Sequence, residues 1–519
     1  MHRARIAALL LLLSSAAFCF LFWYWFGNSA AGPDEFMEGM VRDERGPLAG
    51  AVVRYQTTQT SVYSEADGRF RLPRADGQPA HIAAWKDGYL IGGASVEQTP
   101  LVITLQRLPT EDHEAYRWVG SDPNPKNGQN CGNCHEAIYR EWSASGHARS
   151  VQNRHFLNLY DGTDWQGRLG HGWNLLAEHP DGAGVCTACH APAVASGDPA
   201  YFDLRKLSGT AAQGVHCDYC HKIADVENVQ FGLTHGRFGL KLLRPAHGQL
   251  FFGPLDDVDR GEDAYAPIYR DSRYCASCHE GTVFGVQVYS TYSEWLQSPA
   301  RAQGKQCQDC HMAPTGKLSN LAPGHGGLAR DPNTLADHRL FAGSQLAMLQ
   351  NSLKLSVQCV ATDKETKAEV VLEADQVGHR VPTGFVDRNL VLVVDAWGHA
   401  GKALLPGAAS LHLPDLAGKS LRGHAGKLFA KQLRDFDGHE PAPFWRAQPD
   451  FKDTRLKPGQ PERNTFTFAG RAERVQVRLL YRRFWPSVAD EKGWPDNELT
   501  VADKVLDVAS AQARGGSDP

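Results

Sequence analysis

Five copies of one short pattern, CxxCH, restrict what this chain can fold into more than any other feature. Ten of the 12 cysteines belong to these copies. The five sets are Cys131, Cys134 and His135; Cys186, Cys189 and His190; Cys217, Cys220 and His221; Cys275, Cys278 and His279; and Cys307, Cys310 and His311. A fixed two-residue gap in every pair, always followed by histidine, needs a specific chemical reason.

The spacing predicts covalent haem c. Cysteines three apart in a helical turn face the same side, so both sulfurs can bond the two vinyl groups of one porphyrin. The histidine after the second cysteine then lies under the ring and supplies an axial nitrogen to iron. We therefore predict five covalently attached haem c groups, with His135, His190, His221, His279 and His311 as proximal ligands.

Three other interpretations of the cysteine pairs are weaker. Structural zinc sites combine CxxC pairs, but they do not require a histidine after every second cysteine. Redox-active dithiols of the thioredoxin type need a βαβ context, which this sequence lacks. A disulfide framework would not give five pairs with the same gap.

The segment 116–345 has little regular patterning and is rich in Gly, His, Cys and aromatic residues. Only short helices are predicted, at 136–142 and 290–299. A segment this long without periodicity argues against an ordinary side-chain core. We expect the porphyrins to fill the core and to lie close enough to one another for electrons to pass between them.

The sixth iron ligands are expected to be histidines for most haems. The chain has five methionines, and Met312, directly after an axial histidine, is poorly placed for its own iron. Histidine is abundant, with 22 residues. Haems without a methionine ligand are expected to have lower potentials.

The N-terminal residues 1–32 are predicted to be a membrane anchor or an export signal. Residues 6–26 carry no charge, follow two arginines, and are long enough to cross a bilayer. The alternative is a signal peptide removed near residues 28–30. In both cases the rest of the chain lies outside the cytoplasm. We expect the periplasmic side of a bacterial inner membrane, or secretion after cleavage.

Two segments alternate apolar and polar residues as β-strands do. The first, 36–110, contains strand patterns at 50–56, 68–73 and 100–106. Its phrases GMVRDERGPLAGAVV, SEADGRFRLP and AAWKDGYL resemble the carboxypeptidase regulatory-like domain, which implies a small transthyretin-like β-sandwich without peptidase chemistry. The second, 350–510, has strand patterns at 354–361, 368–374, 389–397, 464–470 and 474–484, and predicts a C-terminal β-sandwich.

The haem segment resembles the multihaem cytochrome c superfamily that includes tetrahaem cytochromes of nitrifiers, pentahaem nitrite reductase and hydroxylamine oxidoreductase. The phrases that carry the resemblance are REWSASGHARS, GVHCDYCHKI, YSTYSEWLQSPARAQGKQCQDCHM and DHRLFAG. The phrases GHRVPTGFVDRNLVLVV and DTRLKPG resemble the β-domain that often follows such segments. The resemblance implies distal ligands at His147, His216, His338 and His379, with His247 and His325 in reserve.

His216 stands directly before Cys217 and cannot easily reach the far face of the same ring. We therefore predict that it ligates a neighbouring haem. His379 lies in a turn of the predicted β-domain, where a histidine hydrogen-bonded to backbone is an equally good interpretation.

The favoured function is electron transfer by a membrane-anchored pentahaem cytochrome. Its expected partners are a quinol-oxidising membrane protein or other cytochromes. The alternative is a reductase or oxidase of a small nitrogen or sulfur compound at one open haem. The sequence departs from pentahaem nitrite reductases, because no CxxCK motif occurs. A structural role within a larger assembly is a third possibility.

Several other functions are excluded or unsupported. A formal net charge of −4 gives no electrostatic basis for nucleic-acid binding. No nucleophile-elbow motif supports hydrolase chemistry. Asp256, Asp257 and Asp259 resemble a calcium loop only superficially, and a solvated acidic turn is expected. Cys359 is expected to be a buried, unpaired thiol.

Overall fold

A computed structural model describes residues 35–508, except 75–76, 78, 182, 195–201, 228–229, 231 and 342–344. The chain divides into two compact units. The first combines residues 1–108 with 255–265, and the second combines 109–254 with 266–519. The sequence did not predict that residues 255–265 belong with the N-terminal part.

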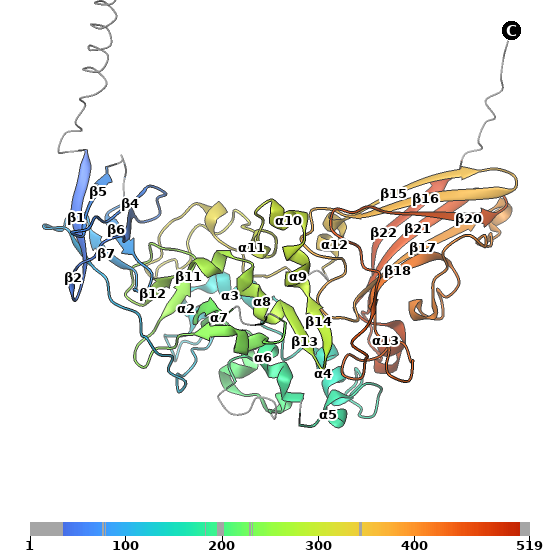
Figure 1. Cartoon of the computed structure of the whole chain (residues 1–519), viewed down its shortest axis with the longest axis horizontal. Coiled ribbons are helices and arrows are strands. Elements are labelled where there is room, and N and C mark those ends of the chain that lie inside the picture. The colour runs from blue at the N-terminus through green and yellow to red at the C-terminus, as the bar shows by residue number, and fades with distance from the viewer. Residues whose placement is uncertain are drawn as a thin grey trace, which may run out of the picture. The chain divides into compact units, whose positions relative to one another are not determined.

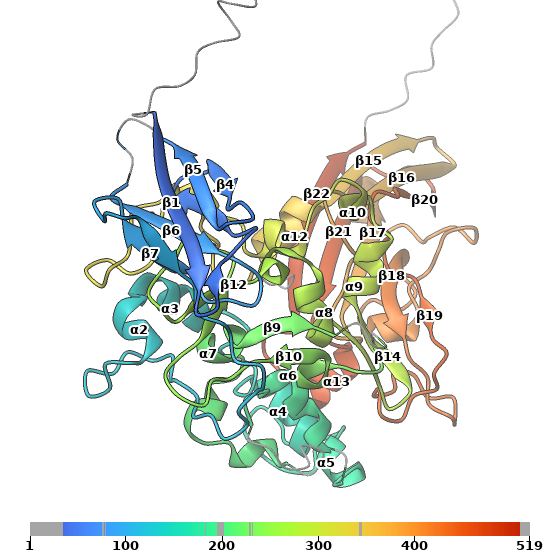
Figure 2. The ribbon, with the colours of Figure 1, turned by 60° about the vertical axis from the view of Figure 1, so that its left-hand side comes forward.

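The first unit is a small β-sandwich (Figure 2). One sheet has the order β2-β1-β5, with β8 paired in parallel with β1, and the other has the order β4-β3-β6-β7. Alternate residues such as Val41, Val53, Phe70 and Ile82 point between the sheets and are buried, which forms the core. Its strands are β1 (Phe36–Asp43), β2 (Gly46–Pro47), β3 (Val52–Tyr55), β4 (Ser61–Tyr63), β5 (Arg69–Pro73), β6 (His81–Trp85), β7 (Gly92–Ser95), β8 (Val102–Thr104) and β12 (Asp263–Tyr265).

The acidic turn at 256–259 contributes to this first unit through its carboxylates. Asp256 accepts from Arg54 Nη2 at 2.5 Å and from Trp85 Nε1 at 2.8 Å. Asp257 accepts from the Thr57 amide at 2.6 Å. The turn was expected to be solvated, but its side chains are engaged in the sandwich, because they satisfy donors on β3 and β6.

The haem segment of the second unit consists of short helices joined by loops and small hairpins (Figure 1). Its helices are α2 (Cys131–Cys134), α3 (Glu136–Ser143), α4 (Arg154–Asp161), α5 (Leu175–Glu178), α6 (Thr187–His190), α7 (Cys217–Cys220), α8 (Arg273–His279), α9 (Thr291–Leu296), α10 (Pro299–Ala302), α11 (Cys307–His311) and α12 (Leu346–Ser352). Its strands are β9 (Ile223–Val226), β10 (Leu240–Leu242), β11 (Phe251–Gly253), β13 (Glu280–Val283) and β14 (Val286–Ser290).

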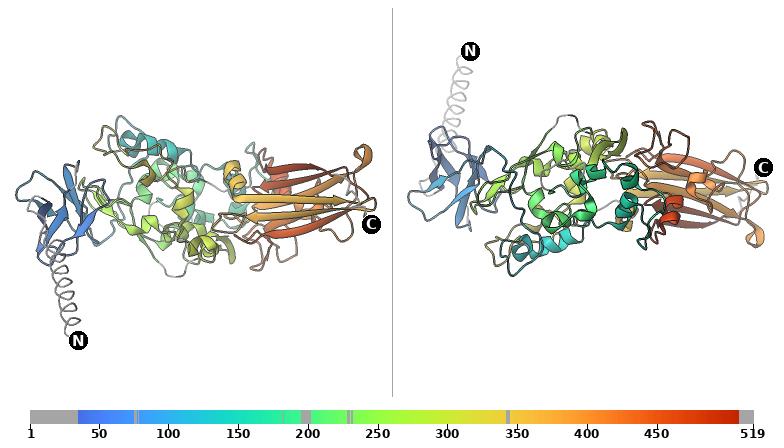
Figure 3. Two further views of the ribbon diagram at one scale, coloured as in Figure 1. Left: turned by 90° about the horizontal axis from the view of Figure 1, so that it is seen from above. Right: turned by 90° about the horizontal axis from the view of Figure 1, so that it is seen from below.

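The C-terminal part of the same unit is a larger β-sandwich, whose sheets are seen from two further directions in Figure 3. The sheets have the orders β15-β16-β20 and β19-β18-β17-β21-β22. Its elements are β15 (Leu353–Ala361), β16 (Glu365–Ala374), β17 (Asn389–Trp397), β18 (Ala425–Gln432), β19 (Lys452–Asp453), β20 (Glu462–Ala469), β21 (Arg474–Arg482), α13 (Pro486–Lys492) and β22 (Glu498–Asp507). Side chains from both sheets, including Leu372, Leu392, Phe466 and Val477, form its core.

The haem segment and the C-terminal sandwich share a second hydrophobic core. It joins Tyr160, Val286 and Val288 to Val391 and Trp485. Polar contacts reinforce this junction: the ammonium of Lys492, fully buried on α13, donates to the carbonyls of Asn158, Thr163 and Trp173 at 2.8–3.2 Å. The sandwich is therefore packed into the haem segment.

Most of the predicted elements are confirmed. The strand patterns correspond to β3, β5, β8, β15, β16, β17, β20 and β21, and the two helical pieces to α3 and α9–α10. Cys359 lies on β15 and is half-buried, less enclosed than expected. The predicted anchor, 1–32, lies outside the described residues. Within the described residues, no helix combines the length and apolarity that a membrane crossing requires.

Candidate haem site

Each CxxCH motif lies on a short helix, as its spacing predicts: α2, α6, α7, α8 and α11. The helices end at or next to the motif histidine, which leaves its ring free to turn toward a loop. Four of the five motif histidines direct Nδ1 at a backbone carbonyl. The pairs are His135 with Leu321 at 2.9 Å, His190 with Ser150 at 3.0 Å, His221 with Phe252 at 2.6 Å and His311 with Phe341 at 2.6 Å.

These contacts determine which nitrogen can bind a metal. A carbonyl oxygen can only accept, so Nδ1 of each ring carries the proton and donates it. In a neutral imidazole, Nε2 then keeps its lone pair. Histidine ligands in proteins are commonly oriented by such a second hydrogen bond. The four rings are therefore in the protonation state that iron ligation requires.

Two motif histidines face a second histidine across a gap of the right width. The ring centroids of His279 and His147 are 6.1 Å apart, and those of His311 and His379 are 6.2 Å apart. Two metal–imidazole bonds of about 2.0 Å each, plus roughly 1 Å from each nitrogen to its ring centre, require a separation of about 6 Å. His147 and His379, both candidates from the sequence, are thus placed as distal ligands would be.

His379 also has the protonation state of a ligand. Its Nδ1 donates to the Arg380 carbonyl at 3.0 Å. His338 has the same feature, because its Nδ1 donates to the Ala336 carbonyl at 3.1 Å. Burial, followed by the nearby His221, lowers the pKa of His338 to about 4. His338 therefore lies near the third motif.

His216 makes a local contact within its own motif helix. It is fully buried at the N-cap of α7, where its Nδ1 accepts from the Tyr219 amide at 3.2 Å. An accepting Nδ1 places the proton of the neutral ring on Nε2, the nitrogen that would have to bind iron. This contact caps the helix, while the buried Nε2 has no hydrogen-bond partner among the described residues, so the ligation of a neighbouring haem stays a prediction.

The two reserve candidates lie on the surface. His247 and His325 are both exposed. His325 belongs to the loop that also supplies the Leu321 carbonyl to His135. Neither ring is paired with a motif histidine in the way that His147 and His379 are.

The rings of His147 and His279 combine accessible surface with close protein surroundings. The side chain of His279 is exposed, yet the surrounding protein lowers its pKa to about 3. His147 is half-buried, and burial lowers its pKa to about 4. A side chain deep within the protein retains accessible surface when it faces an internal space. The residues present therefore fit a bulky group held between the paired rings.

Attachment cysteines of different motifs lie close to one another. The pKa of Cys131 is raised by its neighbour Cys217, that of Cys275 by Cys307, and that of Cys278 by Cys189. The third motif contacts the fourth through the Tyr274 hydroxyl, which donates to the Cys220 carbonyl at 3.0 Å. The motifs thus form a connected series, first to third to fourth to fifth, with the second beside the fourth.

The alternative metal and disulfide interpretations find no support in this arrangement. All the described cysteines are free. Within the described residues, the only His, Cys, Asp and Glu side chains grouped closely enough to hold a metal ion are Asp435, Asp437 and His439, far in sequence from the motifs. The cysteines meet in pairs, which does not make a four-ligand zinc site.

A buried ion pair beside the third motif was missed by sequence reasoning. Asp218, inside the motif, pairs with Lys222, and both side chains are fully buried. The Lys222 ammonium also lies 4.0 Å from the centroid of the Phe251 ring, and Asp218 accepts from the Tyr116 hydroxyl at 3.0 Å. The four-residue spacing of Asp218 and Lys222 could have indicated an ion pair. Pairs with this spacing usually face solvent, so the sequence did not indicate a buried one.

Comparison with known proteins supports a cytochrome. Residues 119–222, which include the first three motifs, match a family described as cytochrome c7 and related cytochrome c. The fold is similar to the crystal structure of a penta-haem cytochrome c552 from Thermochromatium tepidum, with a TM-score of 0.52 and 23% identity, over 73% of this chain and 97% of that one. No curated protein matches. The family match at 119–222 does not extend to the N-terminal residues that resemble a carboxypeptidase regulatory-like domain.

Proposed function

We propose that this protein is a pentahaem c-type cytochrome that transfers electrons between redox partners. The observation that carries the proposal is the series of neighbouring motifs, in which Cys131 lies near Cys217, Cys275 near Cys307, and Cys278 near Cys189. Haem c supplies reversible one-electron chemistry when it is bound. The chain would attach and orient five such groups at neighbouring motifs, which is the arrangement that electron relay requires.

Different residues would attach each haem and provide its two iron ligands. The motif cysteines form the covalent attachments, and His135, His190, His221, His279 and His311 provide the proximal ligands. We assign His147 opposite His279 and His379 opposite His311, because their ring separations of 6.1 and 6.2 Å suit a shared metal. We assign His338 to the third motif, on the basis of its protonation state and its proximity to His221.

The haem count and ligation can be tested together. Alkaline pyridine spectra of the denatured protein, combined with the intact mass, should give five haems per chain. Electron paramagnetic resonance of the oxidised protein should give low-spin signals for at least the third, fourth and fifth motifs. Fewer than five haems, or five-coordinate iron at the fourth and fifth motifs, would contradict the proposal.

A second function is favoured by one observation at the second motif. The ring of His190 stacks on Phe156, with centroids 4.1 Å apart. Among the described residues, no second histidine ring is paired with His190 as His147 is with His279. With the Phe156 ring against His190, this motif is a candidate for an open haem that reduces or oxidises a small nitrogen or sulfur compound. High-spin iron together with turnover of nitrite or hydroxylamine would favour this function; absence of both favours electron transfer alone.

We further propose that the protein works on the periplasmic side of a bacterial inner membrane, anchored through residues 6–26. The support is the uncharged N-terminal run that follows two arginines. Membrane fractionation with N-terminal sequencing of the mature protein tests this point. A mature chain that begins near residue 30 and is recovered in the soluble fraction would favour secretion. We propose a quinol-oxidising membrane protein or another cytochrome as its redox partner.

A further inference from the structure

The proposed distal ligand of the fifth motif comes from a different part of the unit than the motif does. His379 lies in a turn of the C-terminal sandwich, between β16 and β17, whereas His311 ends α11 in the haem segment. Their ring centroids are 6.2 Å apart. Because two metal–nitrogen bonds of about 2 Å each fix this separation, the turn has little freedom to withdraw. Some contact must hold it in place.

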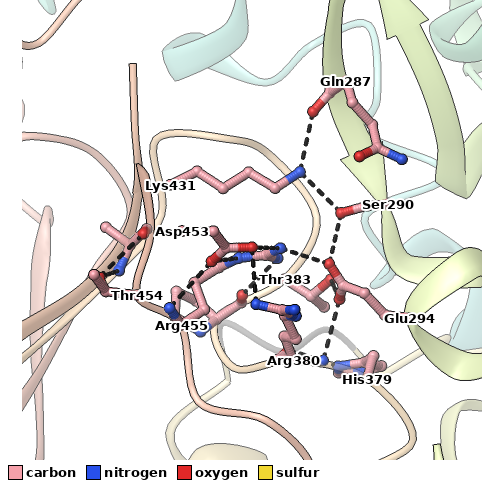
Figure 4. A network of polar contacts seen from close by, with 12 residues as sticks. Gln287, Ser290, Glu294, His379, Arg380, Thr383, Lys431, Asp453, Thr454 and Arg455 are labelled. Atoms are coloured by element: carbon pink, nitrogen blue, oxygen red, sulfur yellow. Dashed lines mark hydrogen bonds and ion pairs between the residues drawn. The ribbon is translucent and has the colours of Figure 1, made fainter. Parts of the chain in front are cut away.

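Glu294 on α9 makes that contact from the haem segment (Figure 4). One carboxylate oxygen, Oε2, accepts from the Arg380 amide at 3.1 Å and from the Thr383 hydroxyl at 3.0 Å. These two donors lie on either side of the turn that begins at His379. The Glu294 carboxylate thus binds the turn at two residues, one of which directly follows His379.

The other oxygen of Glu294 binds the sandwich itself. Oε1 pairs with Arg455 Nη2 at 2.7 Å, and both side chains are buried, with exposed fractions of 7% and 5%. Arg455 also donates to the Pro382 carbonyl at 3.2 Å and pairs with Asp453 at 2.8 Å. The turn is therefore held between Glu294 on one side and Arg455 on the other.

The same carboxylate is oriented by its own helix. Ser290 Oγ donates to Glu294 Oε1 at 2.5 Å and accepts from the buried ammonium of Lys431 at 2.8 Å. Asp453 also accepts from Arg380 Nη1 at 3.1 Å. Contacts of Ser290, Glu294 and Arg380 drawn in Figure 4 thus connect the sandwich to the segment 287–294 or to the turn.

We propose that Glu294 is a positioning residue, which holds His379 at the fifth motif by acting through the 379–383 turn and Arg455. This inference rests on the proposed function, in which His379 binds the haem iron opposite His311. Without the carboxylate, the turn loses two hydrogen bonds and Arg455 loses its partner from the haem segment. Arg455 keeps its pair with Asp453, but α9 no longer holds the turn, so we expect the turn to move away from α9.

The test measures whether the sixth position of one haem becomes available. Carbon monoxide binds ferrous haem where the distal ligand is absent or easily displaced. In the full-length holoprotein, Glu294→Ala should bind about one additional carbon monoxide per five haems and gain a matching high-spin fraction. Glu294→Gln retains an oxygen acceptor for the turn, so it should bind less carbon monoxide than the alanine variant.

A matched control is offered by a second ion pair between the same two parts of the unit. Glu178 on α5 pairs with Arg446 of the sandwich at 2.5 and 2.7 Å and does not contact the 379–383 turn. Glu178→Ala should leave carbon monoxide binding and spin state as in the parent protein. If it changes both as much as Glu294→Ala does, the effect is a general loosening of the junction and the inference is wrong.

His379→Ala separates this inference from the function on which it rests. If that variant gains no carbon monoxide binding, His379 is not a ligand and both the ligation and the positioning role fail. If His379→Ala binds carbon monoxide but Glu294→Ala keeps every haem low-spin and unreactive, the ligation stands and the positioning role is overturned. Carbon monoxide binding by both His379→Ala and Glu294→Ala, with none gained by Glu178→Ala, supports the inference.

Discussion

At the scale of single residues, the hydrogen-bond partner of a histidine shows which ring nitrogen keeps its lone pair. His135, His190, His221, His311, His338 and His379 all donate from Nδ1 to a carbonyl, which frees Nε2. His216 accepts at Nδ1 and is the exception. Motif spacing identifies proximal histidines, but a protonation state follows only from the three-dimensional neighbour, so sequence alone could not separate His216 from His379.

The capping role of His216 can be tested by comparing two substitutions. Serine can accept from the Tyr219 amide in place of the imidazole, whereas alanine cannot. We expect His216→Ser to be more stable than His216→Ala by about 1 kcal/mol. The thermal midpoints of the two holoproteins measure this difference, and the spin state of every haem should remain that of the parent. A high-spin fraction in both variants would show that His216 is a ligand after all.

The buried pair beside the third motif leads to a second prediction. Asp218→Asn removes the carboxylate from Lys222, and both side chains are fully buried. Breaking a buried ion pair at one partner costs on the order of 3–5 kcal/mol. Denaturant titration of the holoprotein should show this loss. Glu136→Gln serves as the control, because the Glu136–Arg140 pair is two-thirds exposed and should change stability by no more than about 0.5 kcal/mol.

At the scale of elements, strand prediction succeeded where the sequence shows a long apolar or alternating run, and the mostly buried β18, AGKLFAKQ, was not predicted. The pattern at 389–397 coincides with β17, whose residues 389–394 are buried in the centre of its sheet. β22 was missed, because most of its ten residues are exposed or half-buried at the sheet edge and show no clear alternation. Short motif helices were anticipated from chemistry, since four-residue helices are too short for a periodic signal.

The segment 255–265 could not be assigned from sequence, because its partners lie about 200 residues earlier in the chain. Asp256→Ala should weaken the first unit by removing acceptors from Arg54 and Trp85. A partly buried, charge-assisted contact of this kind contributes about 1–3 kcal/mol. The change should appear as faster proteolysis within residues 36–108, with an unaltered haem spectrum. A lowered haem content instead would contradict the assignment of this turn to the first unit.

At the scale of the whole molecule, the junction between haem segment and C-terminal sandwich contains an unusual cation. The Lys431 side chain is 2% exposed, and its ammonium donates to the Gln287 carbonyl and Ser290 hydroxyl at 3.0 and 2.8 Å. Burial lowers the pKa of Lys431 to about 8, against the influence of Glu294, Asp453 and Glu280. An unfolded lysine has a pKa of about 10.4.

This difference predicts a pH dependence of stability. Between about pH 8 and 10.4 the unfolded chain binds more protons than the folded one, so the contribution of Lys431 to stability rises with pH. Below that range both states are protonated, and the contribution is constant at its lowest value. Relative to Lys431→Met, the parent should gain on the order of 3 kcal/mol across the range. Denaturant titrations of both proteins from pH 7 to 10.5 measure this difference in the free energy of unfolding. A difference that stays constant over this pH range would contradict the prediction.

The path of the chain between the two units determines what proteolysis or truncation would produce. Because residues 255–265 fold with residues 1–108, the polypeptide passes from one unit to the other three times, after residues 108, 254 and 265. A protease that cleaves near residue 109 therefore produces a nicked protein whose fragments stay together through the hydrogen bonds of Asp256 and Asp257. An expression fragment that starts at residue 109 would contain residues 255–265 without the unit they fold with. A fragment that stops at residue 108 would lack residues 255–265.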